Sequence, residues 1–261
     1  SGFKDRLRRD LYKIKCGFVG APLMIRTMLD CGLIEEAFRI LFSCEYPGWL
    51  YEVLLGATTV WERWNSLLPD GKISGTMMNS LNHYAYGSVA EAVYSYIGGL
   101  SPADIAWKKA FIHPIPSRFV TESSMKFDSP IGEYCCDWFV KGNEFCIKIS
   151  IPHGGKAEVV LPYSDKEKFE LIEGEYSYSY PMNIDFEHPF NADCLAYDIV
   201  KNKKAAKVFS ETLPQAFAMA CGENEEFLTS TIRSMSYLDM FGISKEDLSR
   251  FENEIKNVDI V

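Results

Sequence analysis

The spacing of apolar residues changes its period twice along this chain, and that change constrains the fold more than any other feature. Over roughly the first hundred residues, apolar positions recur at helical spacing, as at Phe3, Leu7 and Leu11. From about Ala106 the chain reads instead as short runs that alternate or are continuously apolar, which is typical of strands. From about Asp193 the helical spacing returns. The sequence therefore predicts helices, then strands, then helices.

Glycine and proline divide the first part into successive amphipathic helices. The expected helices run from Phe3 to a stop at Gly17, from Pro22 to a stop at Gly32, from Leu33 to Cys44, and from Ser80 to Ile97 with Gly87 inside. Short connections between amphipathic helices favour antiparallel helical hairpins.

The middle part contains seven strand-like runs: KKAFIHP, SSMKFD, GEYCCDWFV, EFCIKISI, KAEVVLP, KFELIEG and EYSYSY. Turn residues separate them, and the pair around Gly142 predicts a hairpin. Seven short strands at this spacing favour an antiparallel β-sandwich. In the last part, Ser244 followed by Asp247 is typical of a capped helix N-terminus, so a final helix is expected over KEDLSRFENEIK in an acidic, amphipathic tail suited to packing or assembly.

Composition excludes several classes of partner. The formal net charge of −9 argues against nucleic acid and anionic membrane surfaces. No run of about 18 apolar residues occurs, so no membrane span is expected, and the basic N-terminus lacks the apolar stretch of a secretory signal. None of the eight cysteines forms a C-x-x-C pair, which favours reduced thiols and a cytoplasmic protein. The four histidines lack ligand spacing, so neither a metal nor another cofactor is expected.

The segment ATTVWERW places Glu62 between Trp61 and Arg63, in the part of the chain richest in tryptophan. A carboxylate among indoles has two interpretations. It is either a structural glutamate, solvated or paired with Arg63, or an acid or base in a carbohydrate pocket. Sugars present apolar C–H faces beside hydroxyls, so flat aromatic rings with a few polar groups suit them. Trp49 and Trp61 supply candidate rings, and His83 a candidate polar group.

Glycoside cleavage normally uses two carboxyl groups, one as acid and one as nucleophile or base. The candidates near Glu62 in sequence are Glu35, Glu36, Glu45, Glu52 and Glu91. Glu52 follows Tyr51 and precedes a glycine-bounded turn, so it is a candidate for a pocket, but the sequence does not single out any of the five.

Four motifs occur in order: CGFVGAP, EYPGWLYEV, GATTVWERW and SLNHYAYGSV. Together they resemble the closing part of the catalytic domain of bacterial α-L-rhamnosidases, closely over residues 1 to about 100 and fairly to about 175. The resemblance implies an (α/α)6 barrel followed by a β-sandwich. It predicts the C-terminal half of the barrel over residues 1–105, a β-sandwich domain over 106–180 and a helical extension over 181–261.

The resemblance also implies roles for individual residues. Glu62 matches the family's general base, which activates water in an inverting hydrolysis, and His83 matches a histidine that contacts the sugar or the attacking water. Trp49 and Trp61 are expected as pocket walls. The implied substrate is a terminal α-L-rhamnoside, so a rhamnose-containing carbohydrate is the expected partner.

The family's general acid lies in an upstream stretch rich in Asp and Trp that has no counterpart here. The chain is therefore expected to be inactive alone. Helices that lack neighbours leave an apolar face, so self-association or pairing with the missing barrel half is expected. The alternatives are a non-catalytic carbohydrate-binding or assembly module on the same scaffold and, less favoured, an unrelated helical-plus-sandwich enzyme such as a lyase or phosphorylase.

Overall fold

A computed structural model of the chain describes residues 2–75, 77–184, 186 and 190–258. The chain forms two compact units. One unit spans residues 12–184, and the other combines the first eleven residues with the residues after 184. The predicted domain limits at 105 and 180 stay predictions.

The first half of the 12–184 unit is helical, as predicted. Its helices are α2 (Ala21–Asp30), α3 (Ile34–Leu41), α4 (Trp49–Leu54), α5 (Tyr84–Gly87), α6 (Ala90–Ala92) and the π-helix η1 (Val93–Ile97). The turn from α2 to α3 uses Gly32, whose φ of 72° lies in the left-handed region that glycine adopts at little cost. Fully buried side chains such as Ile25 on α2 and Phe38 on α3 form the core of this helical hairpin.

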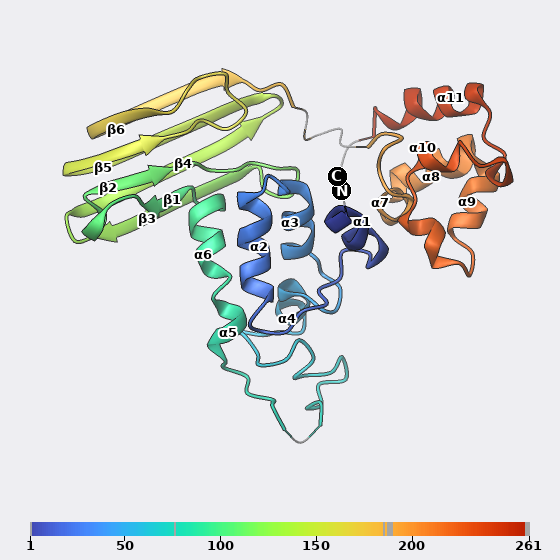
Figure 1. Cartoon of the computed structure of the whole chain (residues 1–261), viewed down its shortest axis with the longest axis horizontal. Helices are drawn as coiled ribbons and strands as arrows, with labels where there is room; N and C mark the ends of the chain where they lie inside the picture. The colour runs from blue at the N-terminus through green and yellow to red at the C-terminus, as the bar shows by residue number, and fades with distance from the viewer. Residues whose placement is uncertain (1, 76, 185, 187–189, 259–261) are drawn as a thin grey trace. The chain divides into compact units, whose positions relative to one another are not determined.

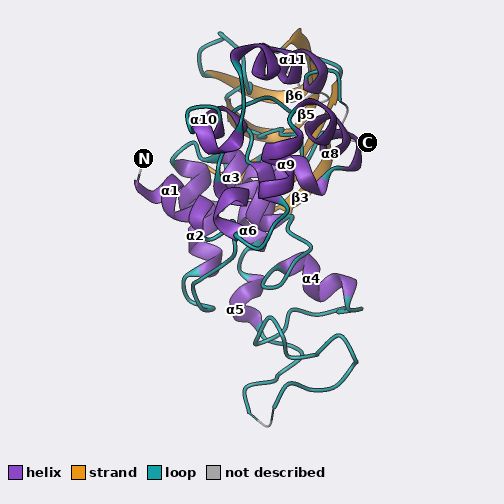
Figure 2. Ribbon diagram, turned by 90° about the vertical axis from the view of Figure 1, so that its right-hand side faces the viewer, coloured by secondary structure: helices purple, strands orange, loops and turns teal. Residues whose placement is uncertain are grey.

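Two helices differ from their expected bounds. The first, α1 (Gly2–Arg9), ends well before Gly17 because Leu11 and Tyr12 adopt left-handed φ values of 49° and 57°, which a helix does not contain. The long helix expected from Ser80 starts only at α5, with His83 as its N-cap residue, and breaks again before α6. The segment between α4 and α5 is mostly loop (Figure 2).

The strands form one six-stranded mixed sheet (Figure 1). They are β1 (Leu100–Pro102), β2 (Lys109–Ile112), β3 (Glu122–Ser129), β4 (Gly132–Lys141), β5 (Glu144–Val159) and β6 (Phe169–Pro181). The order is β1-β2-β5-β4-β3, with β6 also paired to β5; β2 runs parallel to β5 and the other pairs are antiparallel. A helical hairpin part followed by a mostly antiparallel β part and a helical tail confirms the predicted class of fold.

Two of the expected turns lie inside long strands. The runs EFCIKISI and KAEVVLP together supply β5, and KFELIEG and EYSYSY together supply β6. The register of the β5–β6 pairing shifts between Ile151 and Lys156 of β5. This shift marks a bulge around Gly154 and Gly155 rather than a turn. The hairpin at Gly142 is confirmed, because Lys141 and Glu144 pair directly across it.

The sheet is tied to the helical part at the end of η1. Trp138 on β4 is 2% exposed, and its indole N–H donates to the carbonyl of Ile97 over 2.8 Å. Beside it, a side chain on Gly98 would overlap Met125, and one on Gly99 would lie 2.7 Å from the nitrogen of Pro114. The close approach of backbone and sheet at this join therefore requires two glycines.

The second unit is helical. Besides α1 it contains α7 (Ala196–Lys201), α8 (Lys203–Thr212), α9 (Pro214–Ala220), α10 (Ile232–Met235), α11 (Lys245–Ile255) and the 3-10 turns η3 (Glu225–Thr229) and η4 (Asp239–Phe241). Phe209, Phe251 and Ile232 are fully buried in its core. The capping box at Ser244 is confirmed, with its hydroxyl accepting from the Asp247 N–H at 3.0 Å.

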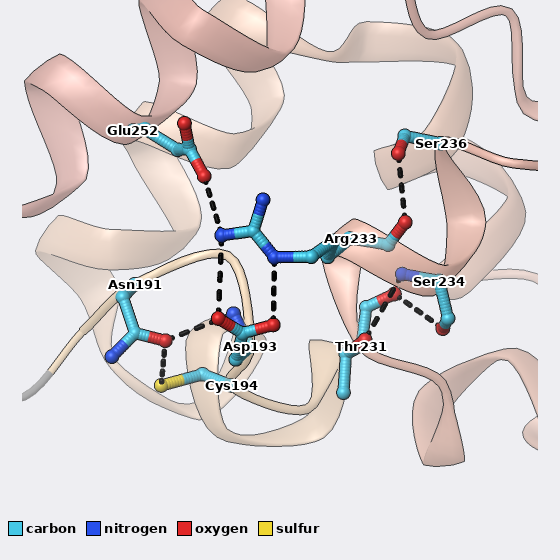
Figure 3. Close-up of polar contacts among 8 residues, drawn as sticks. All are labelled: Asn191, Asp193, Cys194, Thr231, Arg233, Ser234, Ser236 and Glu252. Carbon is cyan, nitrogen blue, oxygen red and sulfur yellow. Dashed lines mark hydrogen bonds and ion pairs between the residues drawn. The ribbon is translucent and has the colours of Figure 1, made fainter.

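An arginine joins three segments of this unit (Figure 3). The guanidinium of Arg233 on α10 donates two hydrogen bonds to Asp193, at 2.8 and 3.2 Å, and one to Glu252 on α11 at 2.6 Å. Both carboxylates raise the pKa of Arg233. These hydrogen bonds link α10 to α11 and to the segment of Asp193. They add little to the free energy of unfolding, because all three side chains are partly exposed.

Candidate functional site

In the loop between α4 and α5, the segment that carries Glu62 pairs through its backbone with the segment that carries His83. The His83 N–H donates to the carbonyl of Val60 at 2.8 Å, and the Glu62 N–H donates to the carbonyl of Ser80 at 2.9 Å. The Thr59 hydroxyl adds a hydrogen bond to the carbonyl of Leu81. These bonds cross some twenty residues of chain, so two motifs that are apart in sequence become neighbours.

The Glu62 carboxylate has a fixed partner. Its Oε2 atom accepts the Ser80 N–H at 3.0 Å, which ties the side chain to the same segment that its backbone pairs with. Glu62 is half-buried and Arg63 is exposed, and within the described residues no ion pair joins the two. The interpretation of Glu62 as a glutamate neutralised by Arg63 therefore has no support in the structure.

His83 sits at the start of α5. Its Nδ1 atom caps the helix by accepting the Ala85 N–H at 3.4 Å. The ring stacks on Tyr84, with centroids 5.5 Å apart and planes 7° apart, and the Phe18 ring approaches within 5.9 Å. Because Nδ1 accepts, the Nε2 atom carries the proton in the neutral ring and is the atom left to meet a ligand.

The tryptophan side chains of this region are buried. Trp61 is 2% exposed and Trp49 is 8% exposed. Trp49 donates its indole N–H to the carbonyl of Tyr86 at 3.0 Å and meets Trp64 edge to face at 5.0 Å, and Trp64 stacks on Tyr86 at 3.8 Å. In this structure the two predicted wall residues support the loop from within; their contact with a sugar stays a prediction.

Glu52 is the residue whose importance the sequence did not reveal. It is 3% exposed on α4, and its Oε2 atom accepts the N–H of Trp61 at 3.2 Å, while its Oε1 atom has no hydrogen-bond partner. Burial raises its pKa to about 7, against a smaller lowering by the Trp61 N–H. The spacing Trp49-x-x-Glu52 puts both residues on the buried face of α4, while Val53 and Leu54 are exposed, but a six-residue helix is too short for the sequence alone to identify that face.

The other carboxylates near Glu62 in sequence have structural partners elsewhere. Glu35 pairs with Arg118 at 2.8 Å, and Glu91 pairs with Arg26 at 3.5 Å. The arrangement therefore places an anchored, half-buried carboxylate and an imidazole on two paired backbone segments, with a second carboxyl buried against the same loop. Such a set can take a proton from water but does not by itself place an acid on the far side of a bond.

The described residues contain no group of three His, Cys, Asp or Glu side chains able to hold a metal. His113 is partly buried and bonded to the carbonyl of Val160, and burial lowers its pKa. His153 lies 2.9 Å from Glu173, and His188 falls outside the described residues. All eight cysteines are free thiols, and no described helix is long and apolar enough to cross a membrane.

Residues 2–97 match the family model of the bacterial α-L-rhamnosidase 6 hairpin glycosidase domain, and residues 99–175 match that of the bacterial α-L-rhamnosidase C-terminal domain. Among curated proteins, an α-L-rhamnosidase of Formosa agariphila is 35% identical over 158 residues, covering 60% of this chain and 17% of that protein. One from Streptomyces avermitilis is 34% identical over 165 residues, covering 63% of this chain and 16% of that protein. The chain thus spans only 16–17% of the length of these curated relatives.

Solved structures show the same likeness. The crystal structure of a native α-L-rhamnosidase from Aspergillus terreus superposes with a TM-score of 0.64 at 35% identity, covering 69% of this chain and 21% of that one. The Streptomyces avermitilis α-L-rhamnosidase in complex with L-rhamnose superposes with a TM-score of 0.63 at 31% identity, covering 67% of this chain and 19% of that one.

Proposed function

Over residues 2–97 and 99–175 this chain belongs to the bacterial α-L-rhamnosidase family, and on that basis we propose that it is the C-terminal portion of a glycoside hydrolase acting on terminal α-L-rhamnosides, with Glu62 as general base. The observation that supports this proposal most is the backbone pairing between the segment that carries the anchored Glu62 carboxylate and the segment that carries His83. The substrate class follows the relatives, one of which was solved with L-rhamnose.

In the proposed mechanism Glu62 removes a proton from a water molecule that attacks the anomeric carbon, and the configuration inverts. The hydrogen bond from the Ser80 N–H holds one carboxylate oxygen, which leaves the other to accept the proton. His83 contacts the sugar or the attacking water through Nε2. The acid that protonates the leaving oxygen comes from residues outside this chain, roughly 6.5–9.5 Å away across the bond.

The test is hydrolysis of an aryl α-L-rhamnoside by the chain alone and by the chain co-expressed with the preceding barrel half of an α-L-rhamnosidase. We expect no turnover by the chain alone. In the co-expressed pair, Glu62→Gln lowers kcat by about 10²–10⁴-fold, the usual range for a lost general base. Glu223→Gln, an exposed glutamate of the other unit, is the matched control and keeps full turnover.

Turnover by the purified chain alone would contradict the proposal that the general acid lies outside this chain. An unchanged kcat in Glu62→Gln would contradict the proposal that Glu62 is the general base. The alternative is a carbohydrate-binding or assembly module without catalysis. It is favoured if the pair has no turnover although L-rhamnose still binds to the chain.

A further inference from the structure

A hollow lies in the 12–184 unit, on elements that do not carry Glu62. It has a volume of about 830 Å³, within the usual range for small-molecule sites. The end of α2, the π-helix η1 and strands β1 and β2 line it, at the place where the helical part meets the sheet. These elements can be followed in Figure 1, with α6 leading from α5 toward the strands.

Aromatic rings form much of the wall of this hollow. Trp107 stacks on Phe127, with ring centroids 4.0 Å apart and planes 23° apart, so the two form one broad plate. Tyr94 contributes a ring that is 50% exposed, and Tyr96 and Phe111 add two more. Flat rings that remain accessible in a hollow are the usual partners of the apolar C–H faces of sugars.

The backbone that carries Trp107 is held in a strained conformation. Ala106 and Trp107 have φ values of 54° and 58°, in the left-handed region that costs non-glycine residues free energy. Tyr134, which is fully buried, fixes the strained residue by donating its hydroxyl to the carbonyl of Trp107 at 2.9 Å. Strain maintained by a buried polar side chain is typical of binding and catalytic segments, so the indole plate is preformed.

Charged side chains line the other side. Arg26 pairs with Glu91 at 3.5 Å and lies 3.8 Å from Asp30. The Tyr96 hydroxyl donates to Asp30, and the Ser95 hydroxyl donates to Glu91 at 3.2 Å. The carboxylates and the guanidinium are about half exposed, so they keep hydrogen-bonding capacity for a ligand.

This chemistry selects among ligand classes. Two carboxylates around a single guanidinium repel phosphates and other anions. The charged side would leave polar groups unpaired against a wholly apolar ligand. A ring with vicinal hydroxyls satisfies both sides, because its hydroxyls donate to Asp30 and Glu91 and accept from Arg26 while its C–H face covers the indole plate.

We propose that this hollow is a second carbohydrate-binding site, which takes a neutral saccharide and is distinct from the Glu62 site. The inference does not depend on the proposed hydrolysis, because a carbohydrate-binding module would use the same hollow. In a hydrolase, the second site would hold a glycan on the protein while its terminal sugar is processed elsewhere.

The test is binding to the full chain, measured by calorimetry or saturation-transfer NMR with two probes: L-rhamnose and the disaccharide α-L-rhamnosyl-(1→6)-D-glucose. We expect Tyr94→Ala to weaken binding of at least one probe by about tenfold, and Trp107→Phe to weaken it less. Tyr237→Ala, a matched control that removes an exposed tyrosine of the other unit, keeps this binding. D-Glucuronate, the charged probe, binds more weakly than L-rhamnose.

Three results overturn the proposal. They are the absence of binding of both probes up to about 10 mM, binding that survives in Tyr94→Ala and Trp107→Phe but is lost in Glu62→Gln, and tighter binding of D-glucuronate than of L-rhamnose. The first two leave the Glu62 proposal open, because that proposal depends on turnover by the co-expressed pair. Far-ultraviolet circular dichroism of each variant confirms that the fold is retained.

Discussion

Glu52 is a carboxyl group that the fold has nearly removed from water. It touches the loop that carries Glu62 through a single hydrogen bond, to the Trp61 N–H, and one of its oxygens is unpartnered. A buried, half-satisfied carboxylate is costly when ionised, so below about pH 7 the protonated carboxyl is the favoured form in the native structure. This makes the support under the Glu62 loop sensitive to pH.

The pH dependence follows from the pKa. Folding raises the pKa of Glu52 from 4.5 to about 7, so its contribution to stability is fully present below about pH 4.5 and is lost as pH rises through about 7. The difference between these two pKa values corresponds to about 3 kcal/mol of unfolding free energy. We expect wild type to lose roughly this amount, relative to Glu52→Gln, between about pH 4.5 and pH 8. Urea unfolding followed by tryptophan fluorescence measures it, because Trp49, Trp61 and Trp64 lie in this region. Parallel pH profiles for the two proteins would show that the carboxyl is solvated.

At this scale the sequence predicted some features and missed others. The motifs around Glu62 and His83 lie on two segments that the backbone does pair, and the joint role of the two residues stays a prediction. They did not predict that Trp49 and Trp61 are buried, because the sequence of a motif does not show whether an aromatic residue faces a ligand or the core. They did not single out Glu52, because burial of a glutamate depends on how α4 packs, and a six-residue helix carries too little periodicity to show it.

Among the secondary-structure elements, β5 and β6 show most clearly what the sequence pattern could not predict, namely whether a glycine interrupts a strand or lies within it. Glycine pairs between strand-like runs indicate turns and bulges equally well, since both need residues without a Cβ. The choice is made by tertiary contacts. A Cβ on Gly155 would lie 2.6 Å from the hydroxyl of Tyr134, so the bulge exists where a buried tyrosine passes under the strand. The end of α1 was missed for a related reason, because left-handed residues such as Leu11 have no signature in hydrophobic spacing.

This contact makes Gly155 a test of the bulge. We expect Gly155→Ala to lower the unfolding free energy by about 1–3 kcal/mol, because the methyl group must displace Tyr134 or distort β5. Gly17→Ala is the matched control, since a Cβ there meets nothing within 4 Å and the backbone is not left-handed. Denaturant unfolding of both variants measures the difference, and equal stabilities would mean that the bulge relaxes freely. Tyr134 also holds Trp107, so Gly155→Ala should weaken saccharide binding as well.

For the whole molecule, the helical part of the 12–184 unit carries an unusual amount of exposed apolar surface. Of the twenty large apolar side chains that are exposed among the described residues, eleven lie between residues 18 and 84. Val19, Leu54 and Met77 are each about two-thirds or more exposed, at 73%, 68% and 75%. Surface of this kind is usually covered by another protein surface.

We therefore expect the purified chain to self-associate, or to pair with a barrel half supplied in trans. Sedimentation velocity over a range of concentrations measures this. Val19→Asp with Leu54→Asp should shift the distribution toward monomer, and Ile172→Asp, an exposed apolar residue of β6, is the control that should not. A concentration-independent monomer that binds no hydrophobic dye would contradict the expectation.

The join at the end of η1 has a consequence for the ancestry of such chains. The two family-defined parts meet between residues 97 and 99, where Trp138 reaches back to Ile97 and two glycines admit Met125 and Pro114. A gene rearrangement that exchanged either part at that point would have to place a backbone carbonyl within reach of the Trp138 indole and keep glycine at both positions. Mutations on one side of this join are therefore expected to be accompanied by compensating changes on the other.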